Sequence, residues 1–128
     1  MIITNWKLGE LIDLTQQVKS SMGYEDNIII VNDENLKDHV KIIPKKVNKI
    51  IEKNNKQKKI IAIAFKNKKG ESFIYYSKFI ILADINMLID IIRHELAHLI
   101  TGENDEGYNF QMFLEVNNIP KEFVFEKN

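Results

Sequence analysis

The sequence predicts an α+β fold, in which a small antiparallel or mixed sheet is packed with helices. Short runs of β-branched and aromatic residues, of strand length, occur at 27–31, 58–66 and 71–82. Longer segments between and after them repeat apolar residues with the period of an amphipathic helix. The chain has 128 residues, which is the length of one domain with one hydrophobic core. We therefore expect a single domain over 1–128.

The first two predicted elements are a helix and a buried strand. Thr4 or Asn5 could cap the helix, and the breaker at 20–23 ends it. The apolar residues that define the helix are Trp6, Leu8, Leu11, Ile12, Leu14 and Val18. The β-branched run at 27–31 follows as a strand. The polar segment 32–40 then predicts a loop or a short helical turn.

A second helix and a β-hairpin are predicted in the middle of the chain. Pro44 suits the first turn of this helix, which has lysines on one face. Its apolar face consists of Val47, Ile50 and Ile51. The segment 58–66 is then a strand, and the turn at 67–70 joins it to one or two strands in 71–82. This arrangement is typical of a hairpin.

Two more helices complete the predicted fold. Asp84 or Asn86 could cap the first of them, and Gly102 lies where it would end. Its apolar positions are Met87, Leu88, Ile91, Ile92, Leu96, Leu99 and Ile100. A short last helix is predicted over about 107–117, and Pro120 blocks its extension.

Composition limits the chemistry and the location of the protein. Cysteine is absent, which excludes disulfides and thiolate ligands and leaves His, Asp and Glu as metal ligands. Residues 41–78 contain twelve lysines against Glu52 and Glu71, whereas the last third is acidic. This basic segment could attract nucleic acid, but no motif supports that, and a solvated surface is the simpler interpretation. Neither a membrane span nor a secretory signal is expected, so a cytoplasmic protein is predicted.

One motif carries chemistry, the H-E-x-x-H formed by His94, Glu95 and His98. Residues four apart share one face of a helix, so both imidazoles can bind one metal ion. Glu95 would then reach a metal-bound water instead of the metal and act as general base. Zinc lowers the pKa of such a water towards about 7. The alternative interpretation is a pair of histidines at a polar edge of the core.

A catalytic zinc ion normally has three protein ligands, so a third must come from elsewhere in the chain. His39 is the only other histidine, and its lysine-rich surroundings favour the surface. Glu103 follows the helix too closely to turn back easily. Asp105 and Glu106 lie at the start of the next helix. We expect Asp105 to cap that helix and Glu106 to bind zinc, with Asp105 as the alternative ligand.

The stretch resembles the SprT-like HExxH metallopeptidases over about residues 60–115. "HELAHLITG" is similar to the first segment of that family, and "EGYNF" at 106–110 matches its H-G-x-x-F, except that Glu106 replaces the histidine ligand. The resemblance implies His94, His98 and Glu106 as ligands and Glu95 as general base. The resulting His₂Glu set also resembles the minigluzincins and the ImmA/IrrE-like peptidases. The cysteine-based zinc ribbon of many SprT-like proteins is absent, so repair of DNA–protein crosslinks is not implied.

The resemblance also implies how a protein or peptide substrate would bind. In such enzymes the peptide lies along an exposed strand edge beside the metal, and 72–82 is the natural segment here. Tyr75, Tyr76 or Tyr108 could stabilise an oxyanion, although ordinary packing of these aromatic rings is the simpler interpretation. The predicted function is a zinc-dependent metallopeptidase. The alternative is a metalloprotease-like binding or regulatory module without peptidase activity.

Overall fold

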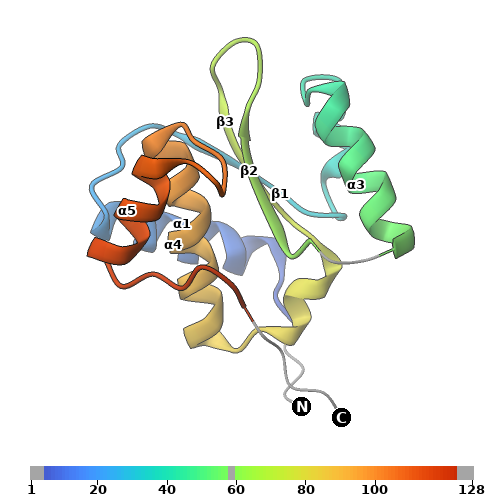
Figure 1. The fold of residues 1–128 in the computed structure, drawn as a ribbon. Coiled ribbons are helices and arrows are strands. Elements are labelled where there is room, and N and C mark those ends of the chain that lie inside the picture. Colours follow the sequence, from blue (N-terminus) through green and yellow to red (C-terminus); the bar gives the residue numbers. More distant parts are fainter. Residues whose placement is uncertain (1–4, 58–59, 124–128) are drawn as a thin grey trace.

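The computed structural model of the chain describes residues 5–57 and 60–123 (Figure 1). Within these residues the fold is α+β, as predicted, with five α-helices, one short 3₁₀ helix and a three-stranded mixed sheet. The elements in chain order are α1 (Leu8–Ser21), β1 (Ile28–Val31), α2 (Leu36–His39), α3 (Lys45–Gln57), β2 (Ala62–Lys66), β3 (Ser72–Tyr76), the 3₁₀ helix η1 (Lys78–Leu82), α4 (Ile85–Thr101) and α5 (Tyr108–Val116). Two predictions, the alternative cap Thr4 and the start of the second strand at 58–59, lie outside the described residues.

The sheet has the strand order β1-β3-β2, with β3 in the centre. β1 runs parallel to β3, and β2 runs antiparallel to it. The predicted hairpin between β2 and β3 is confirmed. In its turn, the N–H of Gly70 donates to the carbonyl of Asn67, and Gly70 has the positive φ of 81° that glycine tolerates best.

The prediction that 72–82 provides an exposed strand edge is wrong. β3 has β1 and β2 on its two sides, and all five of its residues are buried. The apolar run after β3 forms η1 and not a strand, because Ser77 caps it by accepting the N–H of Phe79. A short apolar run fits either structure by composition. The strand with a free edge beside α4 is β2.

Two hydrophobic clusters lie on opposite faces of the sheet, because neighbouring side chains of a strand alternate. Ile74 and Tyr76 of β3 face the cluster formed with α1 and α4. Phe73 and Tyr75 face the smaller cluster, which includes Ile51 of α3. Figure 1 shows α1, α4 and α5 on one side of the sheet and α3 on the other.

The ends of the helices confirm some of the predicted caps and correct one. Asp84 caps α4, since its Oδ1 accepts the N–H of Met87 at 2.9 Å, and Gly102 ends that helix with a φ of 70°. α1 begins later than predicted, with Lys7 and not Asn5 at its N-cap. There the backbone N–H of Lys7 donates to Glu10 Oε1 at 3.0 Å. Within the described residues, no helix is both long and apolar enough to cross a bilayer.

Candidate metal centre

α4 brings the three residues of the motif together on the face that it turns towards β2. His94 and Glu95 are buried and His98 is half-buried. Their potential ligand atoms all lie within 4.8 Å of one another, so this group could hold a metal ion. The prediction that helical spacing places both histidines at one site is confirmed.

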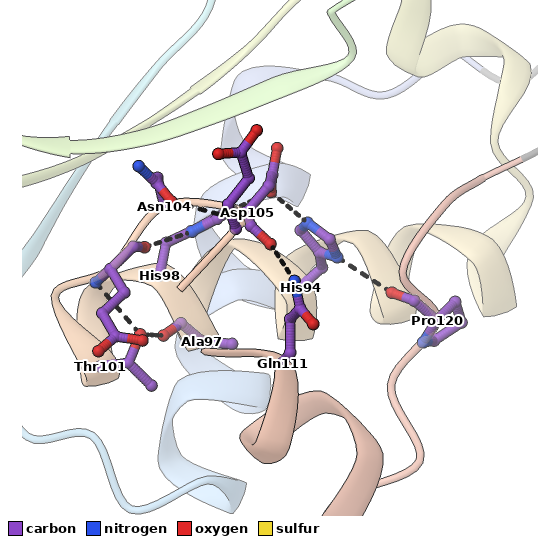
Figure 2. A network of polar contacts seen from close by, with 10 residues as sticks. His94, Ala97, His98, Thr101, Asn104, Asp105, Gln111 and Pro120 are labelled. Atoms are coloured by element: carbon purple, nitrogen blue, oxygen red, sulfur yellow. Dashed lines mark hydrogen bonds and ion pairs between the residues drawn. The ribbon is translucent and has the colours of Figure 1, made fainter. Parts of the chain in front are cut away.

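Backbone carbonyls fix the tautomer and the orientation of both imidazoles. His94 Nδ1 lies 3.0 Å from the carbonyl oxygen of Pro120, and His98 Nδ1 lies 2.8 Å from that of Glu103 (Figure 2). A carbonyl oxygen can only accept, so each Nδ1 carries a hydrogen, and Nε2 is the atom through which each neutral imidazole could bind a metal ion. Hydrogen bonds of this kind orient metal-binding histidines in proteins.

Phe110 of α5 packs against the imidazole rings of both His94 and His98. Its ring stacks on His98, with centroids 4.0 Å apart and planes at 6°, and it meets His94 edge-on at 5.2 Å. Phe123 adds a second edge contact to His94 at 5.6 Å. Because Phe110 is itself fully buried, neither imidazole can turn without displacing part of the core.

The carboxylate of Asp105 lies against both histidines. Its Oδ1 is 2.9 Å from His98 Nε2 and 3.6 Å from His94 Nε2 (Figure 2). With both Nδ1 atoms protonated, the two Nε2 lone pairs and the carboxylate would repel one another unless a cation or a proton lay between them. Two ligands of a tetrahedral zinc ion are about 3.3 Å apart, since each lies about 2.0–2.1 Å from the metal. The two observed distances lie on either side of this value, so the Asp105 carboxylate is close enough to each histidine to share a metal ion with it.

In the loop after α4, the acidic side chains lie in different places from those predicted from the sequence. Glu106 is exposed, and its backbone N–H donates to Asn104 Oδ1 at 2.9 Å. Asp105 does not cap α5, because its carboxylate lies at the histidines. The structure therefore places Asp105, and not Glu106, beside His94 and His98.

The N-cap residue of α5 is Gly107, and the side chain that accepts hydrogen bonds from the first turn belongs to Glu103 and not, as predicted, to Asp105. Its Oε1 accepts the N–H of Phe110 at 2.9 Å, and its Oε2 accepts from the Asn109 side chain at 2.9 Å. Gly107 makes room for this carboxylate, because a Cβ at that position would overlap the side chain of Glu103. Gln111 Nε2 also donates to the backbone carbonyl of Asp105 at 3.2 Å. These contacts hold the loop that carries Asp105.

Glu95 is tied to the sheet on the other side of the site. Its carboxylate accepts the backbone N–H of Ala64 in β2. Burial raises the pKa of Glu95 to about 8, the Ala64 hydrogen bond opposes this rise, and the negative charge of Asp105 adds to it. A carboxyl group with a pKa near neutrality suits transfer of a proton.

A cleft of about 830 Å³ lies between β2 and α4 and contains the motif. The whole of β2 lines one wall, together with Ile60 and Ile61. Ile91, Leu99 and the loop 102–105 line the opposite wall, and Phe123 also contributes to the cleft. The site is therefore open to a substrate along the length of the strand.

The backbone of β2 offers hydrogen-bonding groups to this cleft. In an antiparallel pair, alternate residues direct their N–H and C=O groups to the partner strand. The carbonyl of Ile61 accepts from Ser77 on the β3 side, whereas the N–H of Ala64 points to Glu95. By this alternation the polar groups of Ala62 and Lys66 also project from the free edge.

The other residues singled out in the sequence lie elsewhere or serve packing. His39 ends α2 and is not part of the group that could hold a metal ion. Tyr75 is buried and donates to Asp33 Oδ1 at 2.7 Å, on the α3 side of the sheet. Tyr76 is buried and shares a hydrogen bond with Thr15 at 2.8 Å. Tyr108 is 74% exposed, and its proposed part in oxyanion stabilisation stays a prediction.

Sequence reasoning missed several residues that build the site. The contact of Phe110 with both histidines has no sequence signal, because an aromatic residue in a helix fits ordinary core packing equally well. The Pro120 carbonyl has none either, because any residue supplies that group. No protein-family model, curated protein or solved structure matches the chain. The geometry of this cleft is therefore what indicates a function for the chain.

Proposed function

We propose that the chain is a zinc-dependent metallopeptidase in which His94, His98 and Asp105 hold the metal ion. The observation that carries this proposal is the convergence of two oriented imidazoles and a carboxylate, beside Glu95, in a cleft bordered by a free strand edge. Two neutral nitrogens and one carboxylate oxygen form a ligand set that zinc accepts, with a fourth position left open. Asp105 replaces Glu106 in this proposal because of its distances to the two histidines.

Glu95 is the general base of the proposed reaction. Zinc, when bound, would polarise the substrate carbonyl and lower the pKa of a water molecule. The Glu95 carboxylate would accept the proton of the attacking water and deliver it to the leaving amine. The Ala64 N–H keeps this carboxylate at one position in the cleft, which limits the reorganisation that proton transfer requires.

β2 is the proposed binding edge for the peptide. A substrate in extended conformation could add to the sheet through the outward backbone groups of Ala62 and Lys66. This mode of binding depends on main-chain hydrogen bonds and so tolerates many side chains. It also places the peptide beside Glu95, since Ala64 lies between those two residues.

The first experiment measures the zinc content and the hydrolysis of an unstructured protein such as casein. Wild-type protein should bind about one zinc ion and cleave the substrate, and Glu95→Gln should keep the metal and lose cleavage. Asp105→Asn should weaken zinc binding, whereas Glu106→Gln, a matched change at the next residue, should not. Loss of zinc only in Glu106→Gln would overturn the ligand assignment. Peptide binding without hydrolysis by the zinc-loaded wild type would favour a non-catalytic binding module.

A further inference from the structure

The two ends of the cleft differ in charge and polarity. Ile60, Ile61 and Phe123 make one end apolar, and Glu122 is exposed there. At the other end Lys66 lines the cleft with an exposed side chain. The metal-binding group lies between the two ends, on the part of α4 that faces Ala64.

The geometry points to a substrate preference: the cleft selects peptides that carry an acidic side chain at the position paired with Lys66. This inference rests on the proposed function, because it assumes that a peptide adds to β2. It concerns the choice of substrate and not the chemical step. Lys66 would act as a specificity-determining residue outside the metal-binding group.

The alternation of β2 turns the Lys66 side chain towards the same side as the catalytic group. Ala62 and Ala64 pack against the cluster that contains α4, so Lys66, two residues further on, shares their face. In a pair of strands, directly opposite side chains have Cβ atoms about 4.5–5.5 Å apart. On a bound peptide, the residue paired with Lys66 is therefore two positions away from the residue paired with Ala64. Ala64 is the residue whose N–H binds Glu95.

Lys66 is available for an acidic partner. Among residues 5–57 and 60–123, no carboxylate forms an ion pair with it. Lys68 and Lys69 follow in the hairpin turn, and both are exposed. With Lys41 and Lys45 they line a second groove beside the turn, so the positive charge continues beyond the end of the cleft.

The acids at this end of the cleft do not cancel the charge of Lys66. The Glu103 carboxylate accepts two hydrogen bonds at the start of α5, and that of Asp105 faces the histidines. At the opposite end Glu122 would repel an acidic side chain. A substrate acid is thus favoured on one side of the scissile bond and disfavoured on the other.

The test uses two fluorogenic peptides of identical composition and length. One has aspartate two residues before the scissile bond and alanine two residues after it, and the other has them exchanged. An exposed ion pair corresponds to about a two- to fivefold difference in kcat/KM. We expect one peptide to be preferred by at least this factor, less so at high salt. Lys66→Ala should weaken the preference and leave only the contribution of Glu122. In Lys66→Glu, the preferred charge at the position paired with residue 66 should change from negative to positive, so that lysine is favoured there over aspartate.

Lys53→Glu provides the matched control. Lys53 is an exposed lysine on α3, on the opposite side of the sheet, so this variant has the same net charge as Lys66→Glu and should keep the wild-type preference. A preference that changes equally in both variants would overturn the inference. It would then reflect net charge and not contact with Lys66.

A binding measurement separates this inference from the proposed function. The same peptides are titrated into zinc-loaded Glu95→Gln protein and followed by fluorescence anisotropy, with and without Lys66→Ala. Hydrolysis of both peptides at equal rates would overturn the substrate preference and leave the peptidase proposal intact. A Lys66-dependent preference in binding, without hydrolysis by wild-type protein, would support the substrate preference and overturn the peptidase proposal. Absence of both binding and hydrolysis would overturn both proposals.

Discussion

Glu103 is the residue through which the start of α5 and the loop that carries Asp105 are stabilised together. Its carboxylate accepts the Phe110 N–H and the Asn109 side chain, each at 2.9 Å, and its own backbone carbonyl faces His98 Nδ1 at 2.8 Å. Glu103→Ala removes the carboxylate and keeps the carbonyl. We expect this substitution to destabilise the protein and, separately, to weaken zinc binding.

The expected magnitude follows from the contacts that are lost. A helix cap contributes about 0.5–2 kcal/mol, and a negative charge at a helix N-terminus adds about 0.3–1 kcal/mol. We therefore expect a loss of about 1–2 kcal/mol in the free energy of unfolding. The unfolding entropy is about 2.1 cal/mol/K per residue, or about 0.27 kcal/mol/K for 128 residues. The melting temperature should fall by about 4–7 °C.

The assay is thermal unfolding followed by circular dichroism, with a chelator present so that zinc binding does not contribute. A zinc titration then measures affinity, which we expect to fall by about 10- to 100-fold, as for other residues that orient metal ligands. Glu103→Gln should recover part of the stability, because its amide oxygen can still accept the Phe110 N–H. Glu106→Ala, at an exposed position, is the control. A melting temperature of Glu103→Ala within about 1 °C of that of the Glu106→Ala control would show that the Glu103 carboxylate does not stabilise the start of α5.

Three further predictions test the strand edge, the buried carboxyl group and the metal. Ala62→Pro removes an N–H that points to the cleft and should raise the KM for peptides with little loss of stability. Ile63→Pro removes an N–H that faces β3 and should lower the free energy of unfolding by about 3 kcal/mol or more. Equal destabilisation by the two variants would contradict the assignment of β2 as the free edge. In metal-free protein, burial raises the pKa of Glu95 from 4.5 to about 8. Between these two pH values the folded state therefore binds more protons than the unfolded state. The free energy of unfolding should fall as the pH rises from about 4.5 to about 8. Glu95→Gln should lack this slope in chelator-treated urea unfolding, and a slope that persists would place its origin in another group. Free zinc at about 100 times its Kd should stabilise the wild type by about 2.7 kcal/mol, or about 10 °C in melting temperature, and a shift of the same size with magnesium would argue against a site built from imidazoles.

The features of this protein that depend on near neighbours in the chain could be predicted from its sequence. The i, i+4 spacing of His94 and His98 places them on one face of a helix whatever surrounds it. The cap at Asp84 and the end at Gly102 follow from the preferences of those residues. The α+β class and the hairpin followed in the same way. In each case the decisive contacts join residues only a few positions apart.

The features that depend on distant contacts were decided by the tertiary structure. Asp105 and Glu106 are adjacent acids, and the path of the loop determines which of them reaches the histidines. That path depends on the hydrogen bonds of Glu103 to α5 and on the packing of Phe110 against α4. The free edge likewise depends on the strand order β1-β3-β2, which the hydrophobic period of each strand does not encode. The physical reason is that the period of apolar residues along a segment specifies which face of its own helix or strand a side chain occupies. Which residue lies opposite that side chain across a cleft is determined by how the elements pack together.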